Sequence, residues 1–300
     1  MGCIAIWQNG LFGLICGKSR YTLGQKITDQ HMENYYEPEF VEQLFDDMSK
    51  SYSNMNLIAS FGFSERWRRQ CVAQIKFEEN FVVVDLMTGM GECWHHILQK
   101  CKPGSKLIAL DFSSQMIAHA KKRKQHFKQH PIDVLRESVF NNSIASNSAD
   151  CVISGFGLKT FNRKQLVLLA REIRRILKPE GSFSLIDVSV PDNRLLKGLY
   201  MFYLKNIIPT LGRLFLGNPE TYKMLGIYTE SFKNARMVEE VFKEQGFAVQ
   251  YREYFFGCAT GVAGIRDSNP KIKPNESTNT HLLSLRTPHW FVVRVFPVQL

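Results

Sequence analysis

Val82-Val83-Val84-Asp85-Leu86-Met87-Thr88-Gly89-Met90-Gly91-Glu92 is the stretch that decides the fold. It begins as a β-branched apolar run, which is typical of a parallel strand buried on both faces. An acidic residue and a turn with two glycines follow, and glycine lets the backbone turn sharply and approach a ligand. The position at which such a turn would carry its first glycine is Met87. We expect strand 82–86 to lead through this turn into helix 92–101.

A second strand is predicted at 106–111, and it ends on Asp111. Nucleotide-binding sheets hold ribose hydroxyls at this place, since a carboxylate accepts both hydroxyl protons. The turn lacks the later glycine that packs helix on strand beneath a pyrophosphate, which disfavours nicotinamide cofactors. A cofactor with adenosine but no phosphate fits better, and S-adenosylmethionine is the candidate. The alternative is that the glycine turn is an ordinary strand-to-helix connection without a ligand. The presence of Asp111 at the end of the next strand weakens this alternative.

The rest of the chain continues to alternate between strand and helix patterns. Strands are predicted at 132–136, 150–155, 182–188, 247–254 and 261–265, and helices at 114–127, 163–177 and 234–245. Lys178-Pro179-Glu180-Gly181 is expected to end the helix before it, because proline and glycine cannot continue a helix. Such alternation implies right-handed crossovers between parallel strands. We therefore predict an α/β fold with a Rossmann-like, mostly parallel seven-stranded sheet and helices on both faces.

Two further regions are predicted to form a helical lid over the carboxyl ends of the strands. The first is N-terminal, with helical spacing of apolar residues from Glu39 and an apolar and basic segment at 57–75. The second, 194–216, is apolar and aromatic, and Pro209 is expected to kink or end its helix. One interpretation of 194–216 is a lid helix or a core helix. The other is a surface that accepts a lipophilic substrate or contacts a bilayer. The predicted organisation is an irregular arm at 1–38, a domain at 39–266 with lid segments 39–76 and 194–232, and a linker with an unassigned tail at 267–300.

Composition narrows the classes of partner and compartment. The net charge is +10, but its clusters lie on predicted helices, where solvated charged faces are the simplest explanation and an anionic membrane surface is the next. Nucleic acid is not expected as a partner, since no binding-module motif is present. Seven cysteines without paired metal-ligand spacing indicate a reducing compartment, and no metal site is predicted. No stretch has the length of a membrane span, so we expect a cytoplasmic protein, peripheral to a membrane at most.

Four stretches of the chain carry a resemblance to a known family. The first runs from Leu44-Phe45-Asp46 through Tyr52 and Met55-Asn56 to Ser60-Phe61-Gly62-Phe63 and Arg66-Trp67-Arg68-Arg69. The second is the Asp85 turn with Asp111 and Met116, and the third is Phe156-Gly157-Leu158 with Arg174 to Gly181. The fourth is Asp187 to Pro191 with Tyr222 and Glu230-Ser231. Together they resemble the class I S-adenosylmethionine-dependent methyltransferases, and more narrowly the C-methyltransferases of ubiquinone and menaquinone biosynthesis. Residues 40–266 are covered, and the first stretch is the most distinctive.

The resemblance implies an S-adenosylmethionine site. The backbone at Gly89 to Gly91 would approach the methionine end, Asp111 would hold the ribose, and Met116 would pack on adenine. The full set of implied cofactor-binding residues is Asp85, Gly89, Met90, Gly91, Asp111, Met116, Ser138, Val139 and Gly155. The chain departs from the family pattern at three of them, with Met90 in place of Thr, Ser138 in place of Asn or Asp, and Gly155 in place of Ser.

Two residues are candidates for catalysis. C-methylation requires a phenolate or enolate, so that a ring carbon carries the electron pair, and this needs a base or a cation beside the oxygen. Lys159 stands where the family carries Arg and could act as that cation, and Tyr52 could reach the same space from the lid. The alternative for Lys159 is an exposed lysine that precedes a helix.

The expected function is methylation of a lipophilic quinol or phenolic ring by S-adenosylmethionine, as in ubiquinone or menaquinone biosynthesis. Two alternatives stay open: a methyltransferase for another small aromatic acceptor, and a catalytically silent member that serves as a scaffold. The expected partners are the small lipophilic aromatic substrate, a membrane surface touched peripherally, and a second copy or a quinone-synthesis complex.

Overall fold

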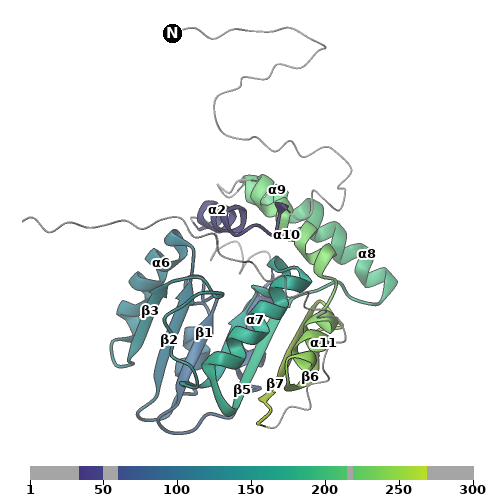
Figure 1. Cartoon of the computed structure of the whole chain (residues 1–300). Helices are drawn as coiled ribbons and strands as arrows, with labels where there is room; N and C mark the ends of the chain where they lie inside the picture. The colour runs from purple at the N-terminus through teal and green to yellow at the C-terminus, as the bar shows by residue number, and fades with distance from the viewer. Residues whose placement is uncertain (1–33, 50–59, 215–218, 269–300) are drawn as a thin grey trace, which may run out of the picture.

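A seven-stranded sheet forms the centre of the computed structural model, which describes residues 34–49, 60–214 and 219–268 (Figure 1). The strands are β1 (Val82–Leu86), β2 (Lys106–Asp111), β3 (Ile132–Arg136), β4 (Ala149–Gly155), β5 (Leu177–Val188), β6 (Phe247–Tyr254) and β7 (Ala259–Arg266). Their order is β3-β2-β1-β4-β5-β7-β6. All neighbours are parallel except β7, which is antiparallel to both β5 and β6. The predicted mostly parallel seven-stranded sheet is confirmed.

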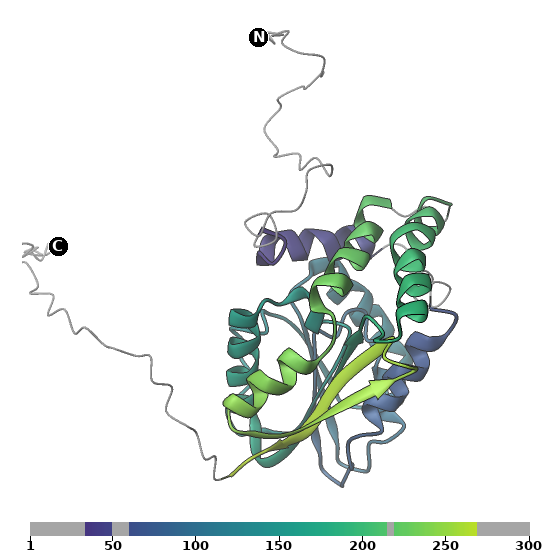
Figure 2. The same ribbon diagram turned by 90° about the vertical axis from the view of Figure 1, so that its right-hand side faces the viewer.

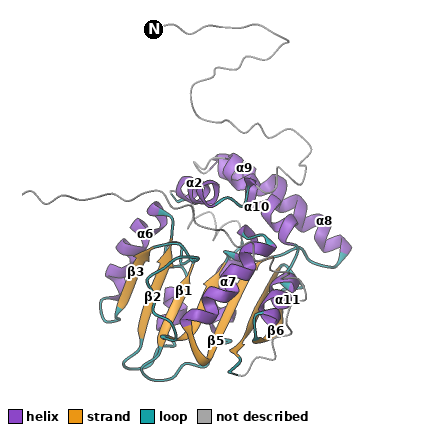
Figure 3. Cartoon of the chain, viewed as in Figure 1, coloured by secondary structure: helices purple, strands orange, loops and turns teal. Residues whose placement is uncertain are grey.

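Helices cover both faces of the sheet, as predicted (Figures 2 and 3). One face carries α4 (Phe63–Val72), α5 (Trp94–Leu98) and α6 (Ser114–Lys124), and the other carries α7 (Arg163–Ile176) and α11 (Arg236–Glu244). Because side chains alternate along a strand, Val83 packs in the core of the first face and Val84 in that of the second. This explains the continuous apolar run of β1, which is buried on both sides.

The lid lies over the carboxyl ends of the strands (Figure 1). It consists of α2 (Pro38–Met48), α8 (Arg194–Phe202), a π-helical segment (Tyr203–Ile207), α9 (Ile208–Leu214) and α10 (Pro219–Phe232). Asp46 of α2 accepts hydrogen bonds from the hydroxyls of Ser113 (2.5 Å) and Ser114 (3.1 Å) at the start of α6. These bonds hold the N-terminal part of the lid against the edge of the sheet.

Pro209 was predicted to kink or end its helix, and the second of these outcomes is wrong, because the lid helix does not end there. The helical path from α8 to α9 is continuous, and the π-helical segment ends at Ile207, two residues before Pro209. Proline has no N–H to donate to the preceding turn, and a single π turn is a common way to accommodate such an interruption. The sequence identifies the interruption but not the local geometry that absorbs it.

Lys178–Gly181 follows the end of its helix as predicted, since α7 ends at Ile176, but these residues belong to β5, which was predicted to begin only at residue 182. β5 begins directly after α7, at Leu177, and the register against β4 is irregular between the pairs Ala149–Leu177 and Cys151–Ser182. Glu180 in this bulge has a φ of 60°. Two helices are shorter than predicted, since α5 covers only Trp94–Leu98 and α6 gives way to a 3-10 turn at Gln125–Phe127.

Some predictions fall on parts of the chain that the structure does not describe. These are most of the arm at 1–38, Tyr52, and most of the tail at 267–300. Within the described ranges, none of the helices combines the length and the apolar character that crossing a bilayer requires.

Candidate functional site

The turn after β1 contains three residues in the left-handed region. The φ angles are 55° at Met87, 58° at Gly89 and 82° at Gly91. A Cβ at Gly91 would lie 2.6 Å from the ring of Trp94, so only glycine fits there. Met87 takes the backbone conformation that glycine adopts without strain, at a cost of roughly 1 kcal/mol for an L side chain. The turn therefore keeps its shape although its first expected glycine is absent.

Asp85 lies beneath this turn. One oxygen of its carboxylate accepts a hydrogen bond from the Thr88 hydroxyl, which itself accepts one from the indole N–H of Trp94 (2.8 Å). The other oxygen is buried and has no partner in the described part of the chain. Burial raises the pKa of Asp85 to about 7, and the negative charge of Glu92 adds to this. Asp85 thus holds the turn from below.

Replacing Asp85 with Asn is expected to reduce the pH dependence of stability. Burial raises the pKa from 3.8 in the unfolded chain to about 7, so the folded protein binds more protons between these values and stability falls as pH rises through them. Asn keeps an acceptor for Thr88 without the charge. The free energy of unfolding at about pH 8 should rise by on the order of a few kcal/mol.

Chemical denaturation at about pH 5 and about pH 8 measures this effect. The matched control is Asp133→Asn, because Asp133 is half-exposed and paired with Lys106 on the neighbouring strand. Asp111, whose pKa is also raised, contributes a slope of the same sign, so the slope should shrink without vanishing. An unchanged slope in Asp85→Asn would contradict the assignment.

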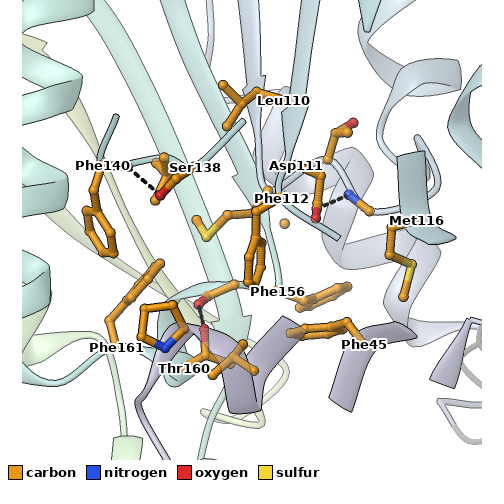
Figure 4. A pocket seen from close by; sticks show the side chains of 18 of the residues that line it. Phe45, Leu110, Asp111, Phe112, Met116, Ser138, Phe140, Phe156, Thr160 and Phe161 are labelled. Carbon is orange, nitrogen blue, oxygen red and sulfur yellow. Dashed lines mark hydrogen bonds between the residues drawn. The ribbon is translucent and has the colours of Figure 1, made fainter. Parts of the chain in front are cut away.

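Asp111 joins the end of β2 to the glycine turn. One oxygen of its buried carboxylate accepts the N–H of Gly89 (2.8 Å; Figure 4). The other accepts the N–H of Ser113 (3.0 Å). Burial raises its pKa to about 6, and the two backbone hydrogen bonds limit the rise. Each oxygen can accept a further hydrogen bond. Asp111 is therefore held in place with acceptor capacity left for a ligand.

A first cavity of about 850 Å³, partly open to solvent, lies above Asp111 and the turn (Figure 4). Six of the nine predicted cofactor-binding residues line it: Gly89, Asp111, Met116, Ser138, Val139 and Gly155. The other three do not. Asp85 and Gly91 shape the turn from behind, and Met90 is buried with its N–H bonded to Glu92 (3.0 Å). For these three, the geometry supports a role in the shape of the turn.

Several residues of this cavity were missed in the sequence. The apolar part of its wall includes Phe45, Phe112, Phe140, Phe156 and Phe161. Phe112 directly follows Asp111, which is the one signal that could have identified it. Phe45 and Phe156 stand in stretches that resemble the family, but only the fold brings them, with Phe140 and Phe161, to the wall of this cavity.

The residues present fit S-adenosylmethionine. Asp111 offers acceptors for a ribose diol, and Met116 with Phe112 offers an apolar surface for a purine. Glu92 also lines the cavity, and its second oxygen, buried without a partner among the described residues, is an acceptor suited to an ammonium group. A ribose, a purine and an ammonium group are the recognisable parts of this cofactor.

A second cavity of about 830 Å³ lies between the lid and the sheet. Its lining is mostly apolar: Leu44, Phe45, Met48, Trp67, Phe156, Val188, Leu204, Ile208, Tyr222, Leu225 and Tyr228, with Ser60, Ser64, Lys159, Thr160 and Thr221. Phe45, Phe156 and Thr160 line both cavities, so the two adjoin. Trp67 is buried, and its indole N–H has no acceptor in the described part of the chain.

Lys159 lines the second cavity close to this boundary. It is only 6% exposed, which rules out the exposed lysine considered from the sequence. Its ammonium lies 2.8 Å from the carboxylate of Asp187, which is buried and also accepts the N–H groups of Lys159 (2.9 Å) and Val188 (2.7 Å). Lys159 is thus a fixed cation in an apolar wall. Tyr52, the second catalytic candidate, is outside the described residues.

The surroundings of Gly155 explain why the chain has glycine where the family pattern has serine. A Cβ at this position would lie 3.0 Å from the sulfur of Cys93. Cys93 is buried behind the first cavity, and burial raises the pKa of its thiol well above the usual value. The neutral sulfur occupies the space beside Gly155, which makes a serine side chain difficult to accommodate there.

This fold and this site define a class of protein. A mostly parallel sheet carries an acid near the end of its first strand, a glycine turn after that strand, and a buried acid at the end of its second strand. A cavity that fits S-adenosylmethionine adjoins an apolar cavity under a helical lid. The protein is an S-adenosylmethionine-dependent methyltransferase. The model of the ubiE/COQ5 methyltransferase family matches residues 30–266, and the chain belongs to this family.

Individual relatives agree with this assignment. The chain is 30% identical over 234 residues to the demethylmenaquinone methyltransferase of Lactococcus lactis subsp. lactis, covering 78% of this chain and 92% of that protein. It is 31% identical over 218 residues to the enzyme of the same name from Thermotoga maritima, covering 72% and 92%. Among solved structures, a chain from a Haloferax volcanii complex of a methyltransferase with its activator matches with a TM-score of 0.50 at 16% identity, over 74% of this chain and 97% of that one. At that identity, the likeness supports the fold alone.

Proposed function

We propose that this methyltransferase C-methylates a lipophilic quinol or related phenolic ring held in the second cavity. The observation that carries the proposal is an apolar cavity that adjoins the cofactor cavity and has a fixed cation, Lys159, near the boundary. The relatives named demethylmenaquinone methyltransferases support the same class of acceptor.

The chemistry assigns different tasks to the two cavities. The bound cofactor supplies an activated methyl group, so the protein must align a nucleophilic carbon with it and keep water away. Loss of the phenolic proton would place electron density on the ring carbon, which would accept the methyl group as the sulfur–methyl bond breaks. The ring carbon would then release its proton, and the phenolic oxygen would regain one. The products are the methylated ring, S-adenosylhomocysteine and one proton.

Residues at the boundary would perform the protein's part of this reaction. Lys159, held by Asp187, would stabilise the phenolate oxygen as charge develops. The indole N–H of Trp67, which lacks an acceptor in the described chain, would donate to an oxygen of the ring. Phe45 and Phe156, which line both cavities, would keep the ring close to the methyl group and exclude water.

The test is transfer of a ¹³C-labelled methyl group from S-adenosylmethionine by the purified full chain. Reduced demethylmenaquinone with a short side chain is one acceptor, and a catechol without a side chain is the other. We expect a product with the label on a ring carbon, formed from the quinol at least tenfold faster. Label on oxygen, or a preference for the catechol, would contradict the proposal and favour another small aromatic acceptor.

A further inference from the structure

The outward face of α8 carries three large apolar side chains. Leu195, Leu199 and Phe202 are 75%, 63% and 60% exposed, and their spacing of four and three residues places them in one stripe. The other side of the helix packs inward, since Met201 is buried and the hydroxyl of Tyr200 donates to the Cys258 carbonyl (3.4 Å). A helix that is apolar on both sides is normally covered on both.

Exposed aromatic rings extend this stripe on the neighbouring elements. Phe61 is 78% exposed, and its ring centroid lies 5.6 Å from that of Tyr203, next to Phe202. Phe256, 73% exposed, lies in the turn between β6 and β7, two residues before the carbonyl that Tyr200 contacts. The α8 apolar surface is defined here as Leu195, Leu199, Phe202, Phe61 and Phe256. It is larger than the scattered apolar residues normal on a protein surface.

Charge indicates what covers the α8 apolar surface. The helical path 194–214 contains Arg194, Lys197, Lys205 and Arg213 and no acidic residue. Lys205 pairs with Glu230 of α10 (2.7 Å), and the other three basic side chains are exposed. A helix with large apolar and aromatic side chains flanked by basic ones is typical of binding to an anionic bilayer surface. A two-fold contact with a second copy would instead bring the same basic residues together.

The inner side of the same helical path lines the second cavity, through Leu204 and Ile208. From this arrangement we propose that the α8 apolar surface docks on the surface of an anionic lipid bilayer. Docking places the second cavity beside the membrane, from which a lipophilic acceptor would enter. Only this last consequence rests on the proposed function, because the docking itself follows from the exposed residues and their charge.

Flotation of the full chain with vesicles tests the docking. The vesicles contain phosphatidylcholine alone or phosphatidylcholine with phosphatidylglycerol. We expect binding to the anionic vesicles, and a decrease of at least about tenfold in the partition coefficient for Leu199→Glu and for Phe202→Glu, since each inserts a charge where an apolar side chain enters the lipid. Arg194→Glu should weaken binding to the anionic vesicles as well, since Arg194 is exposed next to Leu195.

Leu168→Glu is the matched control. Leu168 is a 48% exposed leucine on α7, outside the α8 apolar surface, and its replacement should leave vesicle binding unchanged. Circular dichroism and thermal unfolding confirm that the variants are folded. Absence of binding to the anionic vesicles, equal loss in Leu168→Glu, or a dimer in solution that the α8 variants dissociate without any vesicle binding would each overturn the proposal.

Activity measurements separate this proposal from the proposed function. With a water-soluble, short-chain quinol, Leu199→Glu should keep wild-type turnover, whereas with a long-chain quinol in anionic vesicles its rate should fall about tenfold. If the wild-type protein binds vesicles but methylates neither quinol, the proposed function fails and the docking stands. If it methylates both quinols and α8 variants keep full rates and binding, the docking fails alone.

Discussion

Replacing Asp111 with Ala is expected to weaken S-adenosylmethionine binding by at least about a hundredfold. A carboxylate that accepts two ribose hydroxyls loses two charge-assisted hydrogen bonds, each of which contributes roughly 1.5–3 kcal/mol. The fold should persist, because burial already penalises this carboxylate, as its raised pKa of about 6 indicates. Calorimetric titration with S-adenosylmethionine and S-adenosylhomocysteine measures the affinities.

The pH dependence of affinity provides a second readout for Asp111. A protonated carboxyl accepts hydrogen bonds less well, so the affinity of the wild-type protein should fall as the pH drops below about 6. Asp111→Ala should lose this dependence. Asp133→Ala, on the solvent-exposed part of β3, serves as the control and should bind like the wild type. Unchanged affinity in Asp111→Ala would refute the ribose assignment.

Replacing Lys159 with Met is expected to lower turnover by roughly 10²–10⁴-fold, the range for loss of a group that stabilises developing charge. Affinity for the cofactor should not change, because Lys159 lines only the second cavity. The substitution also leaves Asp187 buried without its cation, which costs about 3–5 kcal/mol of stability. A single variant therefore cannot separate catalysis from folding.

The double variant Lys159→Met with Asp187→Asn makes that separation. Removing both charges relieves the unpaired carboxylate, so stability should recover, while turnover should stay low if Lys159 acts on the acceptor. Single-turnover rates and denaturation curves of all four proteins complete the cycle. Recovery of turnover in the double variant would assign Lys159 a purely structural role.

The order of strands and helices could be predicted from local patterns. The apolar run 82–86 is continuous because β1 is buried on both faces, and Asp111 follows its strand at the edge where parallel strands bring their carboxyl ends together. These features depend on periodicity and on strand ends, which are properties of short segments. Gly89 lies in the glycine turn after β1, whereas Met116 and Ser138 were assigned to the cofactor site by the resemblance to the family; all three line the first cavity.

Other features depend on residues far apart in the chain. The sequence did not indicate that Lys159 pairs with Asp187, which is 28 residues away, or that Phe45 of the lid lines both cavities. Met87 takes a left-handed conformation that its residue type does not predict, because the surrounding turn and Asp85 outweigh the local preference.

By itself, then, the sequence determined the class of fold, the glycine turn and the acid that would hold a ribose, because these follow from local spacing and backbone conformation. The tertiary structure alone decided which of the predicted residues face the cofactor cavity, how Lys159 is held, and that an apolar cavity lies beside it under the lid. The physical reason is that cavities and buried ion pairs form between elements, and their energies depend on packing that brings distant segments together.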